Sequence, residues 1–258
     1  MSAMHSVPPG VEYIVVLTDA PEAVRHLVQR FQRDYRVELI IGNVSVSGMS
    51  AGVNFGAQKA SHEKVVLLDS DCTLTADTLR AYSQALDQAD FVRGVTHVHR
   101  AGFWSSFSGL GQEELNQVSS EGGARLIGPS IAFRRTSFLA LGGYDLAIGG
   151  SCDHEFALRV EDARYKTVFA PEAVVWHTAI TLRIDLQAHF GYGCGMHAID
   201  AKRGGRYGLG VCLDRWAPRT LWRKLTRRGP TSLVRSLLLG GAMLAGYWQA
   251  RWKHRIKT

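Results

Sequence analysis

Two aspartates separated by one residue are the first candidates for chemistry in this chain. Asp69 and Asp71 come directly after the apolar segment at residues 64–68 (KVVLL). Two carboxylates this close repel each other, and a divalent cation relieves the repulsion; hard oxygen ligands suit Mg²⁺ or Mn²⁺. A loop whose aspartates cap the next helix has the same pattern. The pair alone therefore leaves a metal site and a helix cap open.

The segments before this pair alternate between strand and helix patterns. β-Branched apolar runs predict buried strands, and apolar residues three or four apart predict helices. This predicts strands at residues 12–17, 37–41 and 64–68, with helices at about 21–33 and 50–60. The order β-α-β-α-β indicates an α/β fold with a mostly parallel sheet and helices on both faces. Ligands bind beyond the carboxyl ends of such strands, where Asp69 and Asp71 lie.

The second half of the chain continues with less regular patterns. Around Gly191 and Gly193 we expect either a mobile loop or an ordinary loop and helix start. Residues 100–128 form a less regular stretch. The remaining expected elements are a helix near 75–86, strands at 91–99 and 130–133, a helix from 136, a turn at 142–143, and short strands at 167–170 and 174–176.

Five segments, in order, resemble the family 2 glycosyltransferases, which have the GT-A (Rossmann-like) nucleotide-sugar-binding fold. The resemblance runs from about Val11 to Thr178, and the order is far more specific than any one motif. The segments are GMSAGVNFG (48–56), VLLDSD (66–71), GPSIAFRR (128–135) running to GGYD (142–145), CDHEFALR (152–159) and PEAVVWH (171–177).

The resemblance implies a role for each candidate residue. Asp71 and His177 would bind the metal ion near the donor's diphosphate, and Asp69 would reach the donor ribose or the ion's water shell. Asp153 would be the catalytic general base, taking the acceptor hydroxyl's proton as attack inverts the anomeric carbon. Arg159 is expected to pair with a nearby carboxylate. The implied donor-binding residues are Asp19, Asn54, Asp69, Asp71 and Gly128.

Two of these residues also fit purely structural roles. His177 could end a buried strand with a structural hydrogen bond. Asp153 could cap the helix that follows it, and this role is compatible with catalysis.

The amino end departs from the family pattern. The spacing from Asp19 to Asp69 makes residues 12–17 resemble the family's second strand, so the first strand–helix unit is absent on this register. Another register makes them the first strand and places the deletion later. A start codon placed too far downstream, a partner chain, or a degenerate, non-catalytic descendant would explain the absence. Val53 and Cys152 stand where many relatives carry Arg and Glu.

The charge is concentrated at one end of the chain. Residues 1–199 hold 16 Lys+Arg against 21 Asp+Glu, whereas residues 200–258 hold 14 against 2. A net-negative body is not typical of duplex binding, so nucleic acid is not expected as a partner. We divide the chain into a GT-A domain at 1–199 and a basic, Trp/Arg-rich helical extension at 200–258, with helices at 220–228 and about 232–252. Such a composition suits an anionic membrane surface, although the helices could instead pack on the body with their basic groups in solvent.

The remaining features bear on location. The four cysteines show no metal-ligand spacing and indicate reduced thiols, and the first ten residues contain no apolar run. The longest apolar stretch, residues 236–248, is too short to span a membrane. We expect a cytoplasmic protein, with peripheral attachment to the inner face of the membrane as the extension's role.

Together these features predict a metal-dependent, inverting glycosyltransferase. It would move a sugar from a nucleotide-diphosphate donor to a hydroxyl acceptor on a glycan, a lipid-linked molecule or a small molecule. A degenerate GT-A-like binding or assembly protein and a metal-dependent nucleotidyltransferase are the alternatives.

Overall fold

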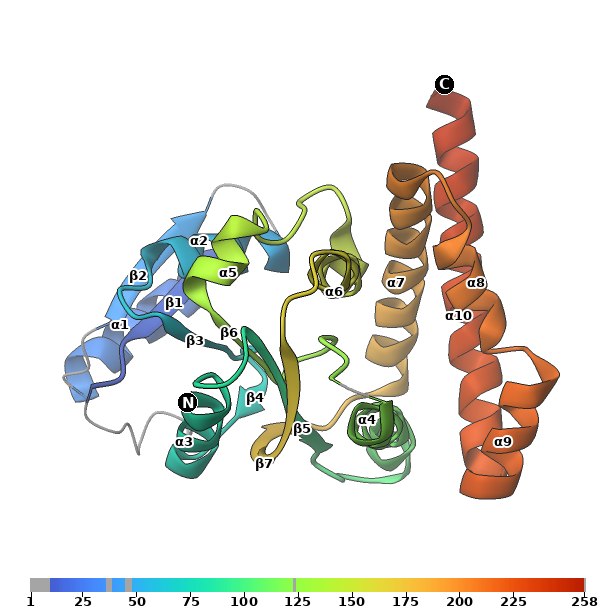
Figure 1. Cartoon of the computed structure of the whole chain (residues 1–258), viewed down its shortest axis with the longest axis horizontal. Coiled ribbons are helices and arrows are strands. Elements are labelled where there is room, and N and C mark those ends of the chain that lie inside the picture. The colour runs from blue at the N-terminus through green and yellow to red at the C-terminus, as the bar shows by residue number, and fades with distance from the viewer. Residues whose placement is uncertain (1–9, 36–38, 45–47, 123, 258) are drawn as a thin grey trace.

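The computed structural model of the chain describes residues 10–35, 39–44, 48–122 and 124–257 (Figure 1). Residues 37 and 38 of the predicted second strand lie outside this set. The strands are β1 (Tyr13–Thr18), β2 (Leu39–Val44), β3 (Lys64–Leu67), β4 (Cys72–Thr73), β5 (Phe91–Val98), β6 (Ile131–Arg134) and β7 (Thr167–His177). The helices are α1 (Glu22–Tyr35), α2 (Met49–Lys59), α3 (Ala76–Ala85), α4 (Phe103–Gly122), α5 (Arg135–Ala140), α6 (Cys152–Asp162), α7 (Leu182–Arg203), α8 (Tyr207–Asp214), α9 (Pro218–Arg228) and α10 (Pro230–Lys257), with a 3₁₀ turn (η2) at Gly149–Ser151.

The sheets confirm the α/β fold class but correct the strand directions. Five strands form one sheet in the order β3-β6-β5-β7-β4, and β1 pairs with β2 in a separate parallel sheet. Within the larger sheet, β5 and β7 are parallel, whereas the β3–β6, β5–β6 and β4–β7 pairs are antiparallel. The sheet is therefore mixed and not mostly parallel. Apolar patterns mark where a strand lies but not which way it runs, so the sequence could not reveal this.

Strands β1 and β3 each have one edge without a strand partner among the described residues. β1 pairs with β2 alone and β3 with β6 alone. All four side chains of β3 and most of those of β1 are only half-buried. The expected absence of a first strand–helix unit stays a prediction.

Helices cover both faces of the larger sheet (Figure 1). On one side α3 packs its buried Tyr82 against β5 and β7, in an apolar cluster that includes Val92 and Val175. On the other, Phe133 of β6 belongs to a cluster that continues through α5 and α6 into α7 and α10, where Met243 is buried. The carboxy-terminal helices therefore share the main core and confirm the predicted helical extension.

Helix α7 replaces the loop expected around Gly191 and Gly193. It runs beside α10 for much of its length (Figure 1). A Cβ on Gly193 would overlap the carbonyl oxygen of Met243, and one on Gly246 would overlap that of Phe190. Glycine lowers helix propensity, but here it lets two helix backbones approach closely. Tertiary packing has thus outweighed the local signal.

Helix α4 was also missed by the sequence patterns. It covers most of the less regular stretch at residues 100–128. Gly111 of α4 leaves room for the guanidinium of Arg235 on α10. A Cβ at Gly111 would lie only 2.6 Å from Arg235 Cζ. A long-range contact of this kind leaves no periodic trace in the sequence.

The predicted domain boundary at residues 199 and 200 lies inside α7. Asp200 is buried there and accepts hydrogen bonds from the N–H groups of Gly208 (2.6 Å) and Leu209 (2.9 Å) at the start of α8. It also accepts one from the Tyr247 hydroxyl on α10 (2.8 Å). One carboxylate thus links α7, α8 and α10. The division into two domains stays a prediction.

The α7–α10 contact generates a stability prediction. Gly193→Val should lower the free energy of unfolding by about 1–3 kcal/mol, because the added side chain forces the helix backbones apart. Gly191→Ala is the matched control, since a Cβ at Gly191 meets nothing within 4 Å; it should stay within about 1 kcal/mol of the wild type. Urea unfolding followed by circular dichroism measures both, and equal stability of the two variants would contradict the proposed packing.

Candidate active site

The pairing of β4 with β7 brings Asp71 and His177 together. Cys72 is the register partner of His177, and the Thr178 N–H donates to the Asp71 carbonyl (2.9 Å). His177 Nε2 lies 3.3 Å from Asp71 Oδ2, and its Nδ1 lies 2.8 Å from the Thr178 carbonyl oxygen. Because a carbonyl only accepts, Nδ1 carries the proton. Nε2 faces Asp71: a protonated ring would donate to this carboxylate, and a neutral ring would offer its lone pair to a cation.

The donor atoms at this point suit a hard or borderline divalent cation. Asp71, Cys72 and His177 offer ligand atoms that all lie within 4.8 Å of one another. Burial, with the charges of Asp69 and Asp71, strongly raises the pKa of the Cys72 thiol, which stays protonated and lies 3.8 Å from Asp71 Oδ1. One carboxylate and one imidazole remain as ligands, a set compatible with Mn²⁺ or Mg²⁺.

Asp69 faces the same site from the end of β3. Burial and the charges of Asp71 and Asp153 raise its pKa to about 6, against the opposing charge of His177. Asp71, Asp153 and His177 therefore lie close enough to act on the carboxyl of Asp69. A bound cation would lower the pKa of Asp69, because it stabilises the charged form.

Asp153 lies in the first turn of α6. Its Oδ2 accepts a hydrogen bond from the Gly128 N–H (2.9 Å), and its Oδ1 accepts one from the His154 N–H (2.8 Å). Burial raises the pKa of Asp153, whereas these two N–H groups and the charge of Arg93 lower it. Position near a helix amino end also favours the carboxylate. Asp153 therefore binds an N–H group in the first turn of α6, as a capping side chain does, and burial raises its pKa, as suits a base.

Arg93 is a buried cation behind Asp153 that the sequence reasoning missed. It has no exposed surface, and its Nη1 donates to the Ser130 hydroxyl and to Thr96 Oγ1 (3.5 Å). Its Nε and Nη2 have no hydrogen-bond partner among the described residues. Burial lowers its pKa to about 10, so it stays charged at neutral pH. An arginine within an otherwise mostly apolar strand was the signal that could have revealed it.

Gly128 is placed by its backbone conformation. Its φ of +89° is in the left-handed region that favours glycine. A Cβ there would lie 3.7 Å from Arg93 Nη1. Gly128 therefore connects the buried guanidinium with the carboxylate of Asp153.

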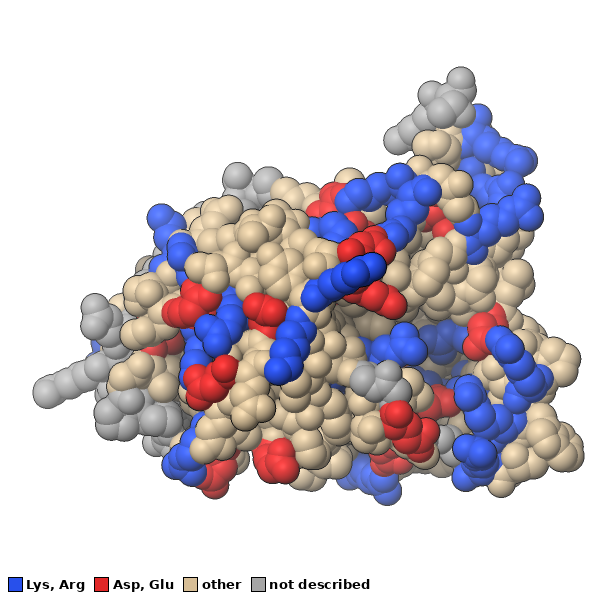
Figure 2. Space-filling view, viewed as in Figure 1, with Lys and Arg blue, Asp and Glu red and all other residues tan. Residues whose placement is uncertain are grey.

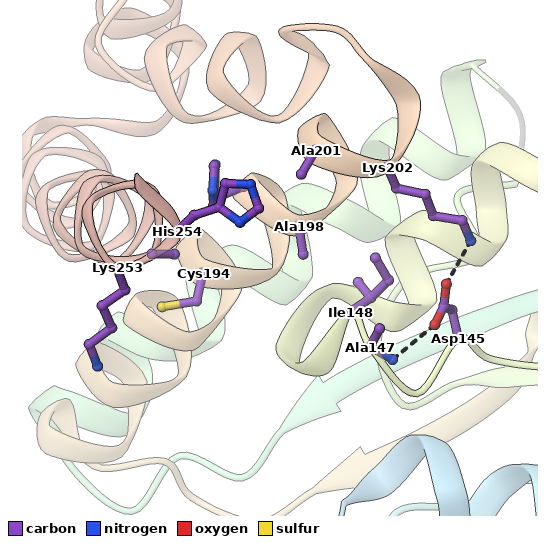
Figure 3. Close-up of a pocket in the computed structure, with 11 residues that line it drawn as sticks. Asp145, Ala147, Ile148, Cys194, Ala198, Ala201, Lys202, Lys253 and His254 are labelled. Carbon is purple, nitrogen blue, oxygen red and sulfur yellow. Dashed lines mark hydrogen bonds and ion pairs between the residues drawn. The ribbon is translucent and has the colours of Figure 1, made fainter. Parts of the chain in front are cut away.

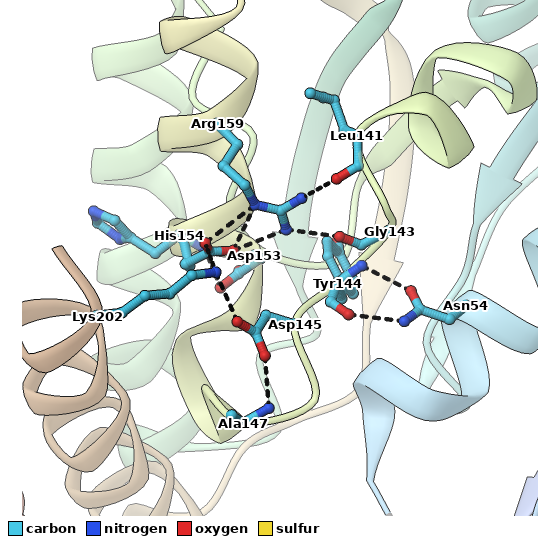
Figure 4. A network of polar contacts seen from close by, with 11 residues as sticks. Asn54, Leu141, Gly143, Tyr144, Asp145, Ala147, Asp153, His154, Arg159 and Lys202 are labelled. Atoms are coloured by element: carbon cyan, nitrogen blue, oxygen red, sulfur yellow. Dashed lines mark hydrogen bonds and ion pairs between the residues drawn. The ribbon is translucent and has the colours of Figure 1, made fainter.

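Asn54 and Arg159 hold the turn of the GGYD motif (Figure 4). Asn54 donates to the Tyr144 carbonyl (2.8 Å) and accepts from the Tyr144 N–H (2.7 Å). Arg159 donates to the carbonyls of Leu141 and Gly143 and pairs with buried Glu155 (2.8 Å). The expected pairing of Arg159 with a carboxylate is confirmed. Glu155 is occupied by Arg159 and Lys202, which leaves it little freedom to act as a base.

Asp19 lies apart from these groups. It follows β1 with a left-handed backbone (φ 49°), is exposed, and its carboxylate forms no hydrogen bond or ion pair with a described residue. Tyr192 of α7, in contrast, approaches the site: burial and the charges of Asp153, Asp185 and Asp69 raise its pKa to about 12. The helix that contains Tyr192 had been expected as a loop, which is why this residue was missed as a neighbour of the base.

Solved structures with a similar fold are glycosyltransferases. The mannosyltransferase PcManGT from Pyrobaculum calidifontis, in complex with GDP-Man and Mn²⁺, has a TM-score of 0.67 at 16% identity, over 94% of this chain and 78% of that one. GalNAc-T7 with UDP, GalNAc and Mn²⁺ has a TM-score of 0.52 at 16% identity, over 71% of this chain and 40% of that one. A TarS fragment from S. aureus with UDP has a TM-score of 0.51 at 12% identity, over 94% and 82%.

These likenesses establish the fold. This α/β domain, with its mixed sheet, has the GT-A fold of these structures. The family model described as "Glycosyltransferase like family 2" matches residues 2–186, and the chain belongs to this family of enzymes. No curated protein sequence is significantly similar to the chain.

Proposed function

We propose that this glycosyltransferase takes its sugar from a nucleoside-diphosphate donor, depends on a divalent cation, and transfers the sugar to a hydroxyl group with inversion at the anomeric carbon. The observation that carries the proposal is the meeting of Asp69, Asp71, His177 and Asp153, from three separate segments, at one site. Family membership favours glycosyl transfer over nucleotidyl transfer for such a cluster.

In this proposal Asp71 and His177 hold Mn²⁺ or Mg²⁺. The structures of PcManGT and GalNAc-T7 were solved with Mn²⁺, which supports a divalent ion here. The cation would neutralise the charge that develops on the leaving diphosphate. Asp69 would bind the donor ribose or water bound to the ion.

Asp153 is the proposed general base. Burial raises the pKa of its carboxyl, as suits a base, while Arg93 and two backbone N–H groups stabilise the ionised form that would take the proton of an acceptor hydroxyl as that oxygen attacks the sugar. Asp19, Asn54 and Gly128 are proposed donor-binding residues. Because the Asn54 amide already binds the Tyr144 backbone, we expect it to act on the donor by holding that turn.

Removal of the base tests the mechanism. Asp153→Asn should lower transfer about 10²–10⁴-fold, because an amide cannot accept the acceptor's proton. Binding of Mn²⁺ should be retained. The measurement is release of nucleoside diphosphate with Mn²⁺ across the common nucleotide sugars, with and without a panel of hydroxyl acceptors.

Glu161→Gln is the matched control, because Glu161 is exposed on the same helix. It should leave transfer unchanged. Equal turnover by wild type and Asp153→Asn, or no turnover by folded wild type with any donor and acceptor, would refute the proposal. The second outcome would instead favour a GT-A domain that binds without catalysis.

We further propose that the carboxy-terminal helices attach the enzyme to an anionic membrane from the cytoplasmic side. Residues 215–258 contain eleven Lys and Arg and no Asp or Glu. Figure 2 shows basic side chains along the end of the molecule formed by these helices. Within the described residues, no helix is both long and apolar enough to cross a membrane.

Helix α10 has an exposed apolar face opposite its buried one. At 3.6 residues per turn, five large exposed side chains fall within about a quarter of the helix circumference. Basic side chains flank this face, and Trp222 of α9 is also exposed (69%). A surface of exposed tryptophans between Lys and Arg is complementary to an anionic lipid interface. The five α10 residues are Val234, Leu238, Trp248, Trp252 and Ile256.

Vesicle co-sedimentation tests the attachment. The wild type should bind vesicles of phosphatidylcholine and phosphatidylglycerol at low salt and pure phosphatidylcholine vesicles much less. The double substitution Trp222→Ser and Trp252→Ser should reduce binding at least several-fold, whereas Trp104→Ser, at an exposed tryptophan of α4, should not. No preference for anionic vesicles would refute the proposal. So would a change of oligomeric mass in the double variant without vesicles, since the face would then join two copies of the chain.

A further inference from the structure

An open surface cavity of about 530 Å³ lies between α7, α10 and the loop that leads to η2 (Figure 3). Its size is within the range of small-molecule sites. It lies at the carboxyl end of α7, where α10 extends past the last core residue, Tyr247. The carboxylate cluster at β3, β4 and α6 does not line it, so this cavity is separate from the proposed active site.

The walls of the cavity are apolar. Ala198 and Ala201 of α7, Ala250 of α10 and Ile148 of the loop contribute to them. Small side chains on both helices leave the space unfilled. A ligand that fits here must bring apolar surface, since otherwise these side chains would gain nothing from its binding.

The charges at the two sides of the cavity differ. On the loop side, Lys202 is bound by Asp145 and by Glu155, each at 2.7 Å (Figure 3). On the α10 side, Lys253 forms no ion pair with any described carboxylate, and His254 lies next to it. The unmatched positive charge is therefore on α10. An anionic group of a ligand would be stabilised there and not beside Lys202.

His197 also lines the cavity, and its side chain has no hydrogen-bond partner among the described residues. Both of its ring nitrogens are buried without a partner among the described residues, and its ring packs edge-on against Tyr247 and His254. Burial and the charges of His254 and Arg251 lower its pKa, against the opposing charge of Asp200. A neutral imidazole in this position can donate one hydrogen bond and accept another. A polar ligand atom would remove the cost of leaving them unmade.

From these features we infer that the cavity binds an amphiphile that carries a phosphate on an aliphatic chain, with the chain against the alanines of α7 and α10 and the phosphate at Lys253 and His254. This goes beyond the proposed reaction, because the ligand would be neither donor nor acceptor. The loop at residues 145–148 leads through η2 into α6, so occupancy would bear on the segment that positions Asp153. A membrane phospholipid and a free lipid phosphate share this chemistry.

Calorimetric titration with octyl phosphate below its micelle-forming concentration tests the inference, in EDTA so that no metal ion recruits phosphate to the active site. One equivalent per chain should bind. Inorganic phosphate should show no measurable binding, and a neutral octyl polyethylene glycol ether should bind at least tenfold more weakly. Equal binding of the neutral ether, or of inorganic phosphate, would overturn the inference.

A second titration with octyl phosphate, after short-chain phosphatidylglycerol has been added, separates the two sources of the ligand. If phosphatidylglycerol blocks octyl phosphate, the ligand is a membrane phospholipid; if it does not, the ligand is a free lipid phosphate.

Matched substitutions on α10 locate the site. Ala250→Phe fills the cavity and should weaken the binding of octyl phosphate at least tenfold, whereas Ala245→Phe, on the exposed side of the same helix, should not.

Lys253→Gln should also weaken this binding about tenfold, with Arg255→Gln as its control. Lys253 is exposed, so this variant will fold even if Ala250→Phe does not. Unchanged affinity in Lys253→Gln, or equal losses in Arg255→Gln, would overturn the inference. Loss of affinity in Trp252→Ser would place the ligand on the membrane-facing surface and overturn it as well.

Discussion

The structure of the site depends on how three carboxylates are kept in one small region. Burial, and then the charges of Asp71 and Asp153, raises the pKa of Asp69, and burial raises the pKa of Asp153. Left uncompensated, such a cluster would take up protons near neutral pH and lose its ability to bind a cation or accept a proton. The protein places His177 beside Asp71 and buries Arg93 behind Asp153 as fixed positive or dipolar partners. A divalent cation would supply the remaining charge.

Much of the fold serves this compensation. The two-residue strand β4 is just long enough to align Asp71 with His177 at the end of β7. The left-handed Gly128 points its N–H at Asp153, and the start of α6 adds a second N–H. Asn54 binds the backbone of Tyr144, and Arg159 binds carbonyl groups of the preceding turn. These contacts hold the segment that leads into α6. Helices α7 and α10 then close the core behind that turn, so the carboxy-terminal helices support the site as well as presenting a basic surface.

The sequence predicted those features that local patterns encode. The strands expected at 64–68, from an apolar run, at 91–99, from an alternating pattern, and at 130–133 each lie within one residue of the observed bounds. The spacing of Asp69 and Asp71, with the resemblance around Asp153 and His177, identified residues that the structure brings together. Strand direction left no local trace. Helices α4 and α7 were hidden because Gly111 and Gly193 weaken a helix signal while permitting close contacts with α10. Arg93 and Tyr192 belong to the site because tertiary packing brings them there, and the spacing of residues in the sequence does not encode that packing.

The most direct test of this account is a titration of the purified protein with Mn²⁺ alone, followed by the loss of the free-ion electron paramagnetic resonance signal. The account predicts one site per chain, weakened at least about tenfold by Asp71→Ala and by His177→Ala. Asp77→Ala, which removes an exposed carboxylate paired with Arg80 on α3, should leave it unchanged. Absence of Mn²⁺ binding by the folded wild type, or equal binding by Asp71→Ala, would contradict the claim that this carboxylate cluster is a cation site.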